Sequence, residues 1–355
     1  MTRGRRAPGR PHPAVAAIRS AVRTCLAAEP QLVFPGKKSS TSDRNISGSR
    51  STTPVRSPLV LVAVSGGADS LALADALAFE WDNAGAVIVD HGLQPDSAQV
   101  AEQAAGTCRA LGLHPVEIVT VAVVDEGTGL EAAAREARYA ALTDAAERHG
   151  AVAVLLGHTR DDQAEQVLLG LTRGSGTRSL SGMPRSRGPF RRPLLGISRE
   201  ETRAACAAED VEFWDDPMND DPAFTRVRAR RALADLDRDL GPGVAAALAR
   251  SADQLRADAD HLDALATAAR DGLPPSGPIS VGDLAAIPGP VRSRVWRILL
   301  TEAGAPAGQT GSTHTDACDR LLTHWSGQGP LNVPGRLEVS RRQGRVHITP
   351  ALPVE

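Results

Sequence analysis

Apolar residues in the first two thirds of the chain fall into short runs that are separated by Ala-rich segments. Four runs rich in Val, Leu, Ile and Ala lie at residues 59–64, 86–89, 115–121 and 152–156. Mainly apolar runs of this kind are typical of strands covered on both faces, as in parallel sheets. The segments between them are long enough for crossover helices. The pattern therefore predicts an α/β domain with a parallel sheet.

The remaining segments are mostly helical in spacing. One apolar stripe predicts a helix at 14–28 and consists of Val15, Ile18, Val22 and Leu26. The last third predicts a smaller, mainly helical domain with a long helix at 243–271, shorter helices at 290–303 and 315–325, and a hairpin at 331–348 that turns at Gln343-Gly344.

Residues 36–58 have a different composition. They are rich in Ser, Thr, Arg, Lys and Gly and contain few apolar side chains, too few to offset the entropy of ordering. We therefore expect a disordered insert. The predicted regions are an N-terminal helix plus insert at 1–58, the parallel-sheet domain at 59–240 and the smaller domain at 241–355.

The most informative segment follows the first predicted strand. Ser65-Gly66-Gly67-Ala68-Asp69-Ser70 connects this strand to a helix-favouring run. Two glycines permit left-handed backbone angles, and the N–H groups that open the following helix attract anions. The segment is neither a Walker A motif nor a G-x-G-x-x-G fingerprint, so it predicts a pyrophosphate-binding loop of another kind, to which Ser65 and Ser70 add hydroxyls. The alternative is an ordinary Gly-Gly turn.

A second polar motif, residues 157–168, follows the fourth predicted strand. If a helix begins after Thr159, then Asp162 and Glu165 share one face of its first turn, where two carboxylates can hold a cation. Thr159-x-x-Asp162 also fits a capping box, which is a structural role. Because the carboxyl ends of parallel strands meet at one sheet edge, we expect this motif, the pyrophosphate loop and residues 90–92 to converge there.

Arginines are the other candidate groups. Arg135 and Arg138 lie one turn apart on a helix predicted at 131–147, although an acidic residue one turn before Arg135 makes a solvated ion-pair face an alternative. Arg173 ends the next helix. A dense cluster of arginines consists of Arg226, Arg228, Arg230 and Arg231. It could be either a phosphate clamp or a solvated surface.

Composition excludes several classes of protein. The formal net charge is −2, so no bulk basicity points to nucleic acid, and Lys occurs only twice among 40 basic residues. The four cysteines are Cys25, Cys108, Cys206 and Cys318. They form no C-x-x-C pair, which argues against a zinc or iron–sulfur site. Reduced thiols are expected. With no stretch of eighteen apolar residues and no signal peptide, we expect a soluble cytoplasmic protein without a membrane partner.

Seven motifs, in this order and spacing, resemble those of the bacterial tRNA(Ile)-lysidine synthetases, N-type ATP pyrophosphatases of the PP-loop superfamily. They are the loop at 65–70, Val89-Asp90-His91-Gly92-Leu93, Glu131-x3-Arg135-x2-Arg138-Tyr139, the segment 157–165, Arg173-Gly174-Ser175-Gly176, Arg192-Pro193-Leu194-Leu195 and Trp214-x-Asp216-Pro217-x-Asn219. The resemblance covers about residues 59–240. It implies a PP-loop ATPase domain of the adenine nucleotide alpha hydrolase type.

The resemblance implies a ligase that joins L-lysine to C2 of the wobble cytidine in the isoleucine tRNA with a CAU anticodon. ATP adenylates the base, pyrophosphate leaves, and the ε-amine of lysine then displaces AMP. ATP phosphates and Mg²⁺ are implied for Ser65, Gly66, Gly67, Ala68, Asp69 and Ser70, with Asp69 as the metal ligand. Asp162 and Glu165 are implied to hold the lysine ammonium. Further roles around ATP, lysine and cytidine fall to His158, Arg138 and Arg230, and other substrate contacts to Arg173, Arg226 and Arg228.

Two departures and two alternatives accompany this resemblance. Val227 stands where the family often has Asn, so no role is carried over to it. Longer members add a tRNA-binding domain beyond the point where this chain ends, and acceptor-stem recognition by such a module is not implied here. A PP-loop tRNA thiolase is the alternative enzyme, which the scattered cysteines disfavour. A non-catalytic tRNA- or nucleotide-binding protein is the other alternative. A homodimer is compatible with the sequence.

Overall fold

The described part of the chain forms two compact units. The structure is a computed structural model and describes residues 10–29, 32, 57–92, 96–123, 129–174 and 176–351. The first unit contains the described residues up to Leu169 and Gly182–Arg250, and the second contains Gly170–Ser181 and the described residues from Ser251 onward. The insert predicted at 36–58 lies outside the described residues, apart from its last two. The three-region division of the chain stays a prediction.

The first unit is built on a mostly parallel sheet, as predicted. Its strands lie in the order β3-β2-β1-β4-β6-β5, and only β5 runs antiparallel to its neighbour. The strands are β1 (Val60–Val64), β2 (Ala84–Asp90), β3 (Val116–Thr120), β4 (Ala153–Leu156), β5 (Ser186–Arg187) and β6 (Phe190–Arg191). The first four match the four apolar runs. β5 and β6 have two residues each, too few to produce a recognisable period.

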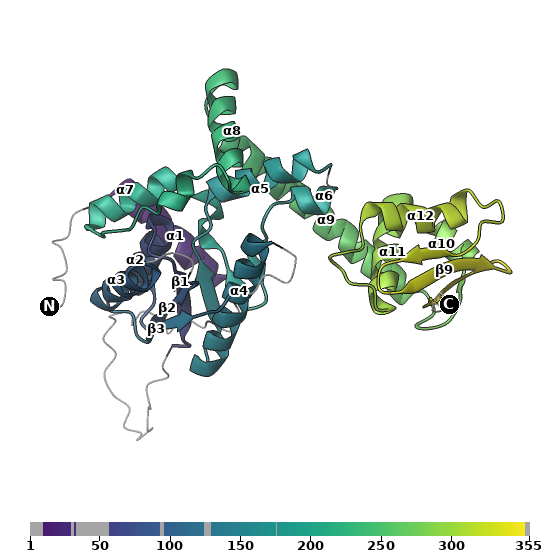
Figure 1. Cartoon of the computed structure of the whole chain (residues 1–355), viewed down its shortest axis with the longest axis horizontal. Helices are drawn as coiled ribbons and strands as arrows, with labels where there is room; N and C mark the ends of the chain where they lie inside the picture. The colour runs from purple at the N-terminus through teal and green to yellow at the C-terminus, as the bar shows by residue number, and fades with distance from the viewer. Residues whose placement is uncertain are drawn as a thin grey trace, which may run out of the picture. The chain divides into compact units, whose positions relative to one another are not determined.

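Helices cover both faces of this sheet (Figure 1). α1, α2, α3 and α7 lie on one side of β1, β2 and β3, and α4 lies on the other. Accordingly, Val62 of β1 packs in the core of the first group, whereas Leu61 packs with Leu142 of α4. The helices of this unit are α1 (Pro13–Ala27), α2 (Ala68–Glu80), α3 (Ser97–Ala110), α4 (Leu130–His149), α5 (Arg160–Thr172, whose end enters the second unit), α7 (Arg199–Glu209) and α8 (Thr225–Leu240), with 3-10 turns η1 (Pro193–Gly196) and η2 (Pro217–Asp220).

The second unit combines helices with a small antiparallel sheet in the order β7-β10-β9-β8. Gln343 and Gly344, both with positive φ, join β9 to β10, which confirms the predicted hairpin turn. The elements are α6 (Thr177–Leu180), most of α9 (Val244–Asp271), β7 (Ile279–Ser280), α10 (Val281–Ala286), α11 (Gly289–Glu302), α12 (Ser312–Thr323), β8 (Leu331–Val333), β9 (Leu337–Arg342) and β10 (Arg345–Pro350). Trp296 of α11 is fully buried in its core.

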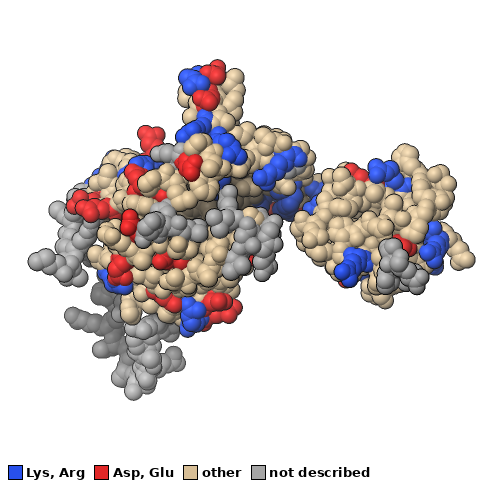
Figure 2. All heavy atoms as spheres, viewed as in Figure 1, with Lys and Arg blue, Asp and Glu red and all other residues tan. Residues whose placement is uncertain are grey.

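Within the described residues, every helix is too short or too polar to span a bilayer. Figure 2 shows acidic and basic side chains on the visible face of each unit, in keeping with the small net charge. The cytoplasmic location stays a prediction.

The strand order marks where a ligand would bind. From β1, the chain builds β2 and β3 on one side and then returns to place β4 on the other. Ligands of open parallel sheets bind beyond the carboxyl ends of the strands at such a reversal. The loops that follow β1 and β4 are therefore the ones to inspect, and they carry the two strongest sequence motifs.

Candidate active site

The loop between β1 and α2 is shaped by its own residues. Gly66 has a φ of +88°, in the left-handed region that favours glycine. The Ser70 hydroxyl donates to the carbonyl of Gly67 (2.9 Å) and accepts from the backbone N–H of Ser65 (3.1 Å), so it stabilises the loop. α2 then begins at Ala68 without a side-chain cap. The backbone N–H groups of its first turn are thus suited to an anion.

A close approach of two backbones places the second motif beside this loop. Gly157 follows β4, and a Cβ at this position would lie 3.1 Å from backbone atoms of Asp69 and Ser70. That distance is tighter than most real contacts, so a side chain would push the turn before α5 away from the start of α2. Glycine here lets Asp162, in the first turn of α5, lie near Asp69.

The Asp162 carboxylate is divided between two partners. Its Oδ2 accepts from the backbone N–H (2.7 Å) and hydroxyl (3.1 Å) of Thr159, so the capping role weighed from the sequence is real. Its Oδ1 accepts from Arg199 Nη2 at 2.7 Å. Burial alone would raise the pKa of Asp162, but the Arg199 charge and the Thr159 N–H outweigh burial and hold the pKa below its ordinary value. Asp162 is therefore ionised at neutral pH and serves both the helix and the network.

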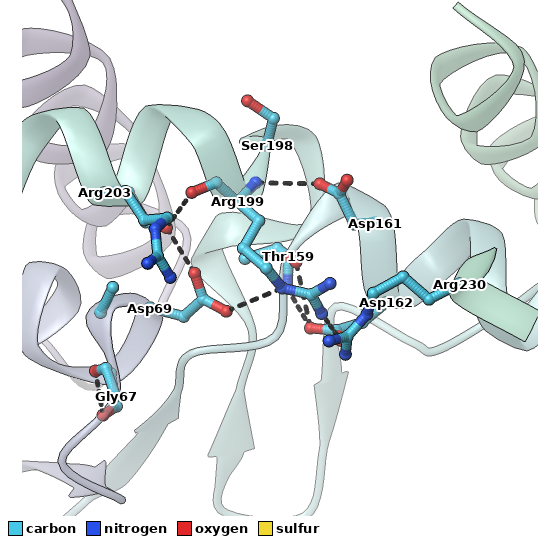
Figure 3. A network of polar contacts seen from close by, with 12 residues as sticks. Gly67, Asp69, Thr159, Asp161, Asp162, Ser198, Arg199, Arg203 and Arg230 are labelled. Carbon is cyan, nitrogen blue, oxygen red and sulfur yellow. Dashed lines mark hydrogen bonds and ion pairs between the residues drawn. The ribbon is translucent and has the colours of Figure 1, made fainter. Parts of the chain in front are cut away.

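One arginine at the start of α7 joins three carboxylates. The Arg199 guanidinium lies 2.7 Å from Asp162 and 3.4 Å from Asp69 (Figure 3). It also lies 3.3 Å from Glu165. Its backbone N–H also donates to Asp161 at 2.9 Å, which fixes the start of α7 against α5. Three separate helices thus contribute to one charged cluster.

Glu165 is the most buried member of the cluster. The residue is 1% exposed, and its Oε1 accepts from Arg199 (3.3 Å) and from Arg230 Nε of α8 (3.0 Å). Its Oε2 is buried and has no hydrogen-bond partner among the described residues. Buried carboxylate oxygens are normally paired, so this oxygen is a candidate ligand contact.

Asp69 connects the cluster to the pyrophosphate loop. Its Oδ1 accepts a hydrogen bond from the Thr202 hydroxyl, and its Oδ2 lies 3.4 Å from Arg199. Burial raises the pKa of Asp69 above its ordinary value, although Thr202 and the Arg199 charge oppose this shift. Asp69 lies in the first turn of α2, so it is the carboxylate of the cluster that is next to the anion-binding end of this helix.

A cavity of about 830 Å³ contains this cluster and the loop. The predicted residues that line it are Ser65, Gly67, Ala68, Asp69, Ser70, Arg138, His158, Asp162, Glu165, Arg226 and Arg230. A more apolar hollow of about 230 Å³ shares Ser65 and Arg138 with this set, and its walls include Val64, Ile88, Val100, Trp214 and Met218. The cavity therefore contains an anion-binding helix end and a carboxylate cluster, and the apolar hollow lies next to it.

Two basic groups in the cavity are strongly influenced by burial. Burial lowers the pKa of His158 well below its ordinary value, since the neighbouring arginine charges add to burial and only Asp162 opposes them. His158 is therefore neutral near pH 7. Burial also lowers the pKa of Arg138, but an arginine stays charged. Among the described residues, none forms a hydrogen bond or ion pair with Arg138, which leaves its charge for a ligand.

Comparison with known proteins identifies the family. A family model described as a PP-loop domain matches residues 41–236. The chain is 51% identical to the tRNA(Ile)-lysidine synthase of Streptomyces coelicolor over 94% of this chain and 97% of that one. It is 48% identical to that of Salinispora arenicola over 96% and 98%. This chain belongs to the tRNA(Ile)-lysidine synthase family. It is accordingly an enzyme that uses ATP through a PP-loop, as the resemblance implied.

A solved structure supports the fold. The U34-tRNA thiolase NcsA from Methanococcus maripaludis, with its [4Fe-4S] cluster, has a TM-score of 0.51 and 18% identity over 68% of this chain and 79% of that one. At this identity the likeness concerns the fold alone. The described cysteines are all free, and burial raises the pKa of the thiols of Cys108, Cys206 and Cys318 to about 12. Such thiols are protonated at neutral pH and poorly suited to sulfur transfer.

Not every predicted residue lies at the cavity. Arg173 follows the last residue of α5, is exposed and belongs to the second unit. Arg228 is exposed and donates to the carbonyls of Pro222 and Ala223, next to the start of α8. Val227, by contrast, is 6% exposed and lines the cavity, so the apolar residue at this departure from the family forms part of the cavity wall. The substrate-binding roles of Arg173 and Arg228 stay predictions.

The sequence interpretation missed Arg199. A usable signal was present, because Ser198 and Glu201 form a full capping box and so mark Arg199 as the first residue of a helix. Nothing in this pattern shows that the arginine turns back towards α2 and α5. The same holds for Thr202, whose hydroxyl holds Asp69.

Proposed function

We propose that this chain adenylates the carbonyl at C2 of the wobble cytidine in a CAU-anticodon isoleucine tRNA and then joins L-lysine to that carbon. In the first step the base oxygen forms a bond to the α-phosphorus of ATP and pyrophosphate leaves. In the second step the ε-amine of lysine attacks C2, the bond to the adenylate oxygen breaks and AMP leaves. The observation that carries this proposal is that one cavity holds both the pyrophosphate loop and the carboxylates Asp162 and Glu165.

The loop and α2 are assigned to the ATP phosphates. The uncapped N–H groups at the start of α2 favour negative charge, and Gly66 and Gly67 allow close approach. The neighbouring apolar hollow suits the adenosine, since apolar side chains in its walls, such as Val64 and Val100, can pack against a flat aromatic base. The positive charge of Arg138 would offset charge on the reacting phosphate.

Asp69 is assigned to Mg²⁺. Magnesium ions in nucleotide sites are usually held by one or two carboxylates together with phosphate oxygens. Asp69 fits, because it is a single carboxylate beside the anion-binding end of α2. The ion would neutralise phosphate charge when bound with ATP. The Thr202 hydrogen bond would keep the carboxylate in place.

Asp162 and Glu165 are assigned to lysine, and the remaining basic groups to the anionic substrates. Asp162 is ionised, and Glu165 offers an unpaired buried oxygen. Arg226 and Arg230 lie one turn apart on α8 and both line the cavity, as expected for contacts with tRNA or AMP phosphates. Neutral His158 can donate or accept one hydrogen bond at the reacting base. Dimerisation stays a prediction.

The decisive experiment is mass spectrometry of nucleosides from an unmodified CAU-anticodon isoleucine tRNA. The tRNA is incubated with the protein, ATP, Mg²⁺ and L-lysine, and omission of lysine is the control. The expected product is a cytidine derivative that carries the lysine mass, with one AMP released per modified base. An unchanged cytidine, or incorporation of sulfur from a sulfur donor, would refute the proposal and favour the thiolase alternative.

A further inference from the structure

The second step of the proposed reaction needs a proton acceptor. Lysine enters as an ammonium with a pKa of about 10.4, and only the neutral amine can attack carbon. Two groups that line the cavity are poor acceptors, because the pKa of Asp162 is held below its ordinary value and burial lowers the pKa of His158 to about 3. Transfer even to a carboxylate with a pKa of about 4.3 is unfavourable by a factor of about 10⁶. A stronger base is required.

Tyr139 of α4 provides such a group at the cavity wall. Its side chain is half-buried and lines the cavity. The ring packs edge-on against Phe190 of β6, with ring centroids 4.9 Å apart. Its hydroxyl oxygen accepts from Arg192 Nη2 at 3.0 Å and from Arg135 Nη2 at 3.4 Å. The ring is therefore held by packing, and its oxygen is held by two guanidinium groups.

The hydrogen bonds at this oxygen leave one direction for a ligand. A phenol has two acceptor lone pairs and one O–H donor. Arg135 and Arg192 occupy the lone pairs, and the described residues provide no acceptor for the hydrogen. Once this hydrogen is lost, its position can accept from an ammonium, while both arginines donate to the phenolate oxygen. The surroundings of Tyr139 therefore suit the ionised form.

The charges that face the phenol act in the same direction. They belong to Arg135 and Arg138 of α4 and to Arg192, which follows β6. Burial alone would raise the pKa of Tyr139, but these charges and the Arg192 hydrogen bond outweigh burial and hold the pKa below its ordinary value of about 10. The same charges disfavour an ammonium beside the phenol, so they also make its proton easier to remove. Acid and base are thus far closer in pKa than lysine and a carboxylate.

On these grounds, which rest on the proposed function, we propose that the Tyr139 phenolate is the general base of the second step. It takes one proton from the ε-ammonium of lysine, which gives a neutral phenol and a free amine. The lone pair of the amine forms the bond to C2, the bond from C2 to the adenylate oxygen breaks, and AMP leaves with that electron pair. The new C–N nitrogen keeps one hydrogen and releases the other as a proton with AMP. The phenol loses its proton to solvent before the next turnover.

The first experiment is direct, because Tyr139 is the only tyrosine in the chain. The near-ultraviolet absorbance of tyrosinate, followed against pH, therefore reports this phenol alone, with Tyr139→Phe as the blank. We expect it to titrate below about 10. Arg135→Gln removes one facing charge and should raise the pKa. Arg148→Gln is the matched control from the same helix, where Arg148 pairs with Glu117, and should not change it. Titration at or above 10, or no rise in Arg135→Gln, would overturn the proposal.

The second experiment separates the two steps. The protein first adenylates the CAU-anticodon tRNA with ATP and Mg²⁺, and lysine is then added for a single turnover. Tyr139→Phe keeps the ring that packs against Phe190 and loses only the hydroxyl. Adenylation should change little, whereas lysine transfer should slow by about 10²- to 10⁴-fold, the usual contribution of a general base. The loss should shrink at high pH and with thialysine, whose terminal amine is more acidic. Arg148→Gln should leave both steps unchanged.

Three results of the second experiment would contradict the proposal. One is a Tyr139→Phe variant that transfers lysine at the wild-type rate. Another is a variant in which both steps slow by the same factor, as a merely structural tyrosine predicts. The third is a greater loss in adenylation than in transfer, which would make the phenol a hydrogen-bond donor to the base or the nucleotide. Failure of the proposed function differs from all three, since the wild type would then make no lysine adduct.

Discussion

The two units each contain a partly buried arginine that binds carboxylate, and the two networks differ in how completely they are satisfied. In the second unit, Arg292 donates to both oxygens of Asp319 (2.6 and 3.0 Å) and to two backbone carbonyls, and Trp296 Nε1 also donates to Asp319 (3.1 Å). In the first unit, Arg199 is shared by three carboxylates, and one buried oxygen of Glu165 has no partner among the described residues.

This difference separates a structural network from a binding site. One arginine and one aspartate match each other in charge and in hydrogen bonds, so the Arg292 network stabilises the fold and offers little to a ligand. Three carboxylates around Arg199, with Arg230 as a further partner, keep excess negative charge and an unused acceptor at a cavity. Buried polar groups that are left incomplete call for a functional explanation.

The largest expected effect concerns Asp69, the carboxylate beside the pyrophosphate loop. Asp69→Asn keeps the shape and can still accept from Thr202, but it loses the charge assigned to Mg²⁺. We expect AMP release to be abolished while circular dichroism shows an intact fold. Asp75→Asn, in the same helix but paired with Arg19, is the control. Wild-type turnover by Asp69→Asn would remove the assignment.

The next effect concerns lysine. Glu165→Gln and Asp162→Asn should each raise the apparent KM for lysine by orders of magnitude, since breaking one side of a buried ion pair costs about 3–5 kcal/mol. Adenylation of tRNA without lysine should persist more nearly intact, and it is measured by transfer of label from α-labelled ATP to tRNA. If both variants keep the wild-type lysine dependence, the carboxylate pair serves only as part of the helix start.

For the Arg292 network we expect a change in stability and little change in lysine binding. Asp319→Asn removes the charge partner of Arg292, so we expect the free energy of unfolding to fall by roughly 3 kcal/mol, the low end for a broken buried pair. Because Asp319 lies in the other unit and shares no hydrogen-bond or ion-pair partner with Asp162 or Glu165 among the described residues, the KM for lysine should stay within about twofold. Denaturant unfolding and steady-state kinetics measure the two quantities. A shift in lysine KM without a loss of stability would break the comparison.

The smallest expected effect is a dependence of stability on acid. The hydrogen bonds from Arg292 hold the pKa of Asp319 below its ordinary value, against the opposing effect of burial. A depressed folded-state pKa adds stability above the unfolded pKa of about 3.9, and this stability is lost as pH falls through the folded pKa. Unfolding of the wild type should therefore become easier below about pH 4. Asp319→Asn should show a shallower dependence, and equal slopes would show that other groups control it.

Much of the first unit could be predicted from local patterns. Three of the four apolar runs became β1, β2 and β4, which are buried almost throughout and must therefore be apolar on both faces. β3 lies at the edge of the sheet, is only partly buried and includes Glu117 and Thr120. The Ser65 loop could be recognised because its residues are contiguous in the sequence. A Gly-Gly turn between a strand and a helix, followed by Asp69 and Ser70, is typical of a pyrophosphate-binding loop. β5 and β6 could not be predicted, since two residues show no period.

The sequence by itself thus determined the first four strands, the pyrophosphate loop and the pairing of carboxylates at positions 162 and 165 on one helix face, since each depends on residues close together in sequence. Only the tertiary structure decided that Asp162 divides its oxygens between Thr159 and Arg199, and that Arg199 reaches Asp69 from 130 residues away. Contacts between separate helices depend on how the helices pack against the sheet, and no local period records that packing.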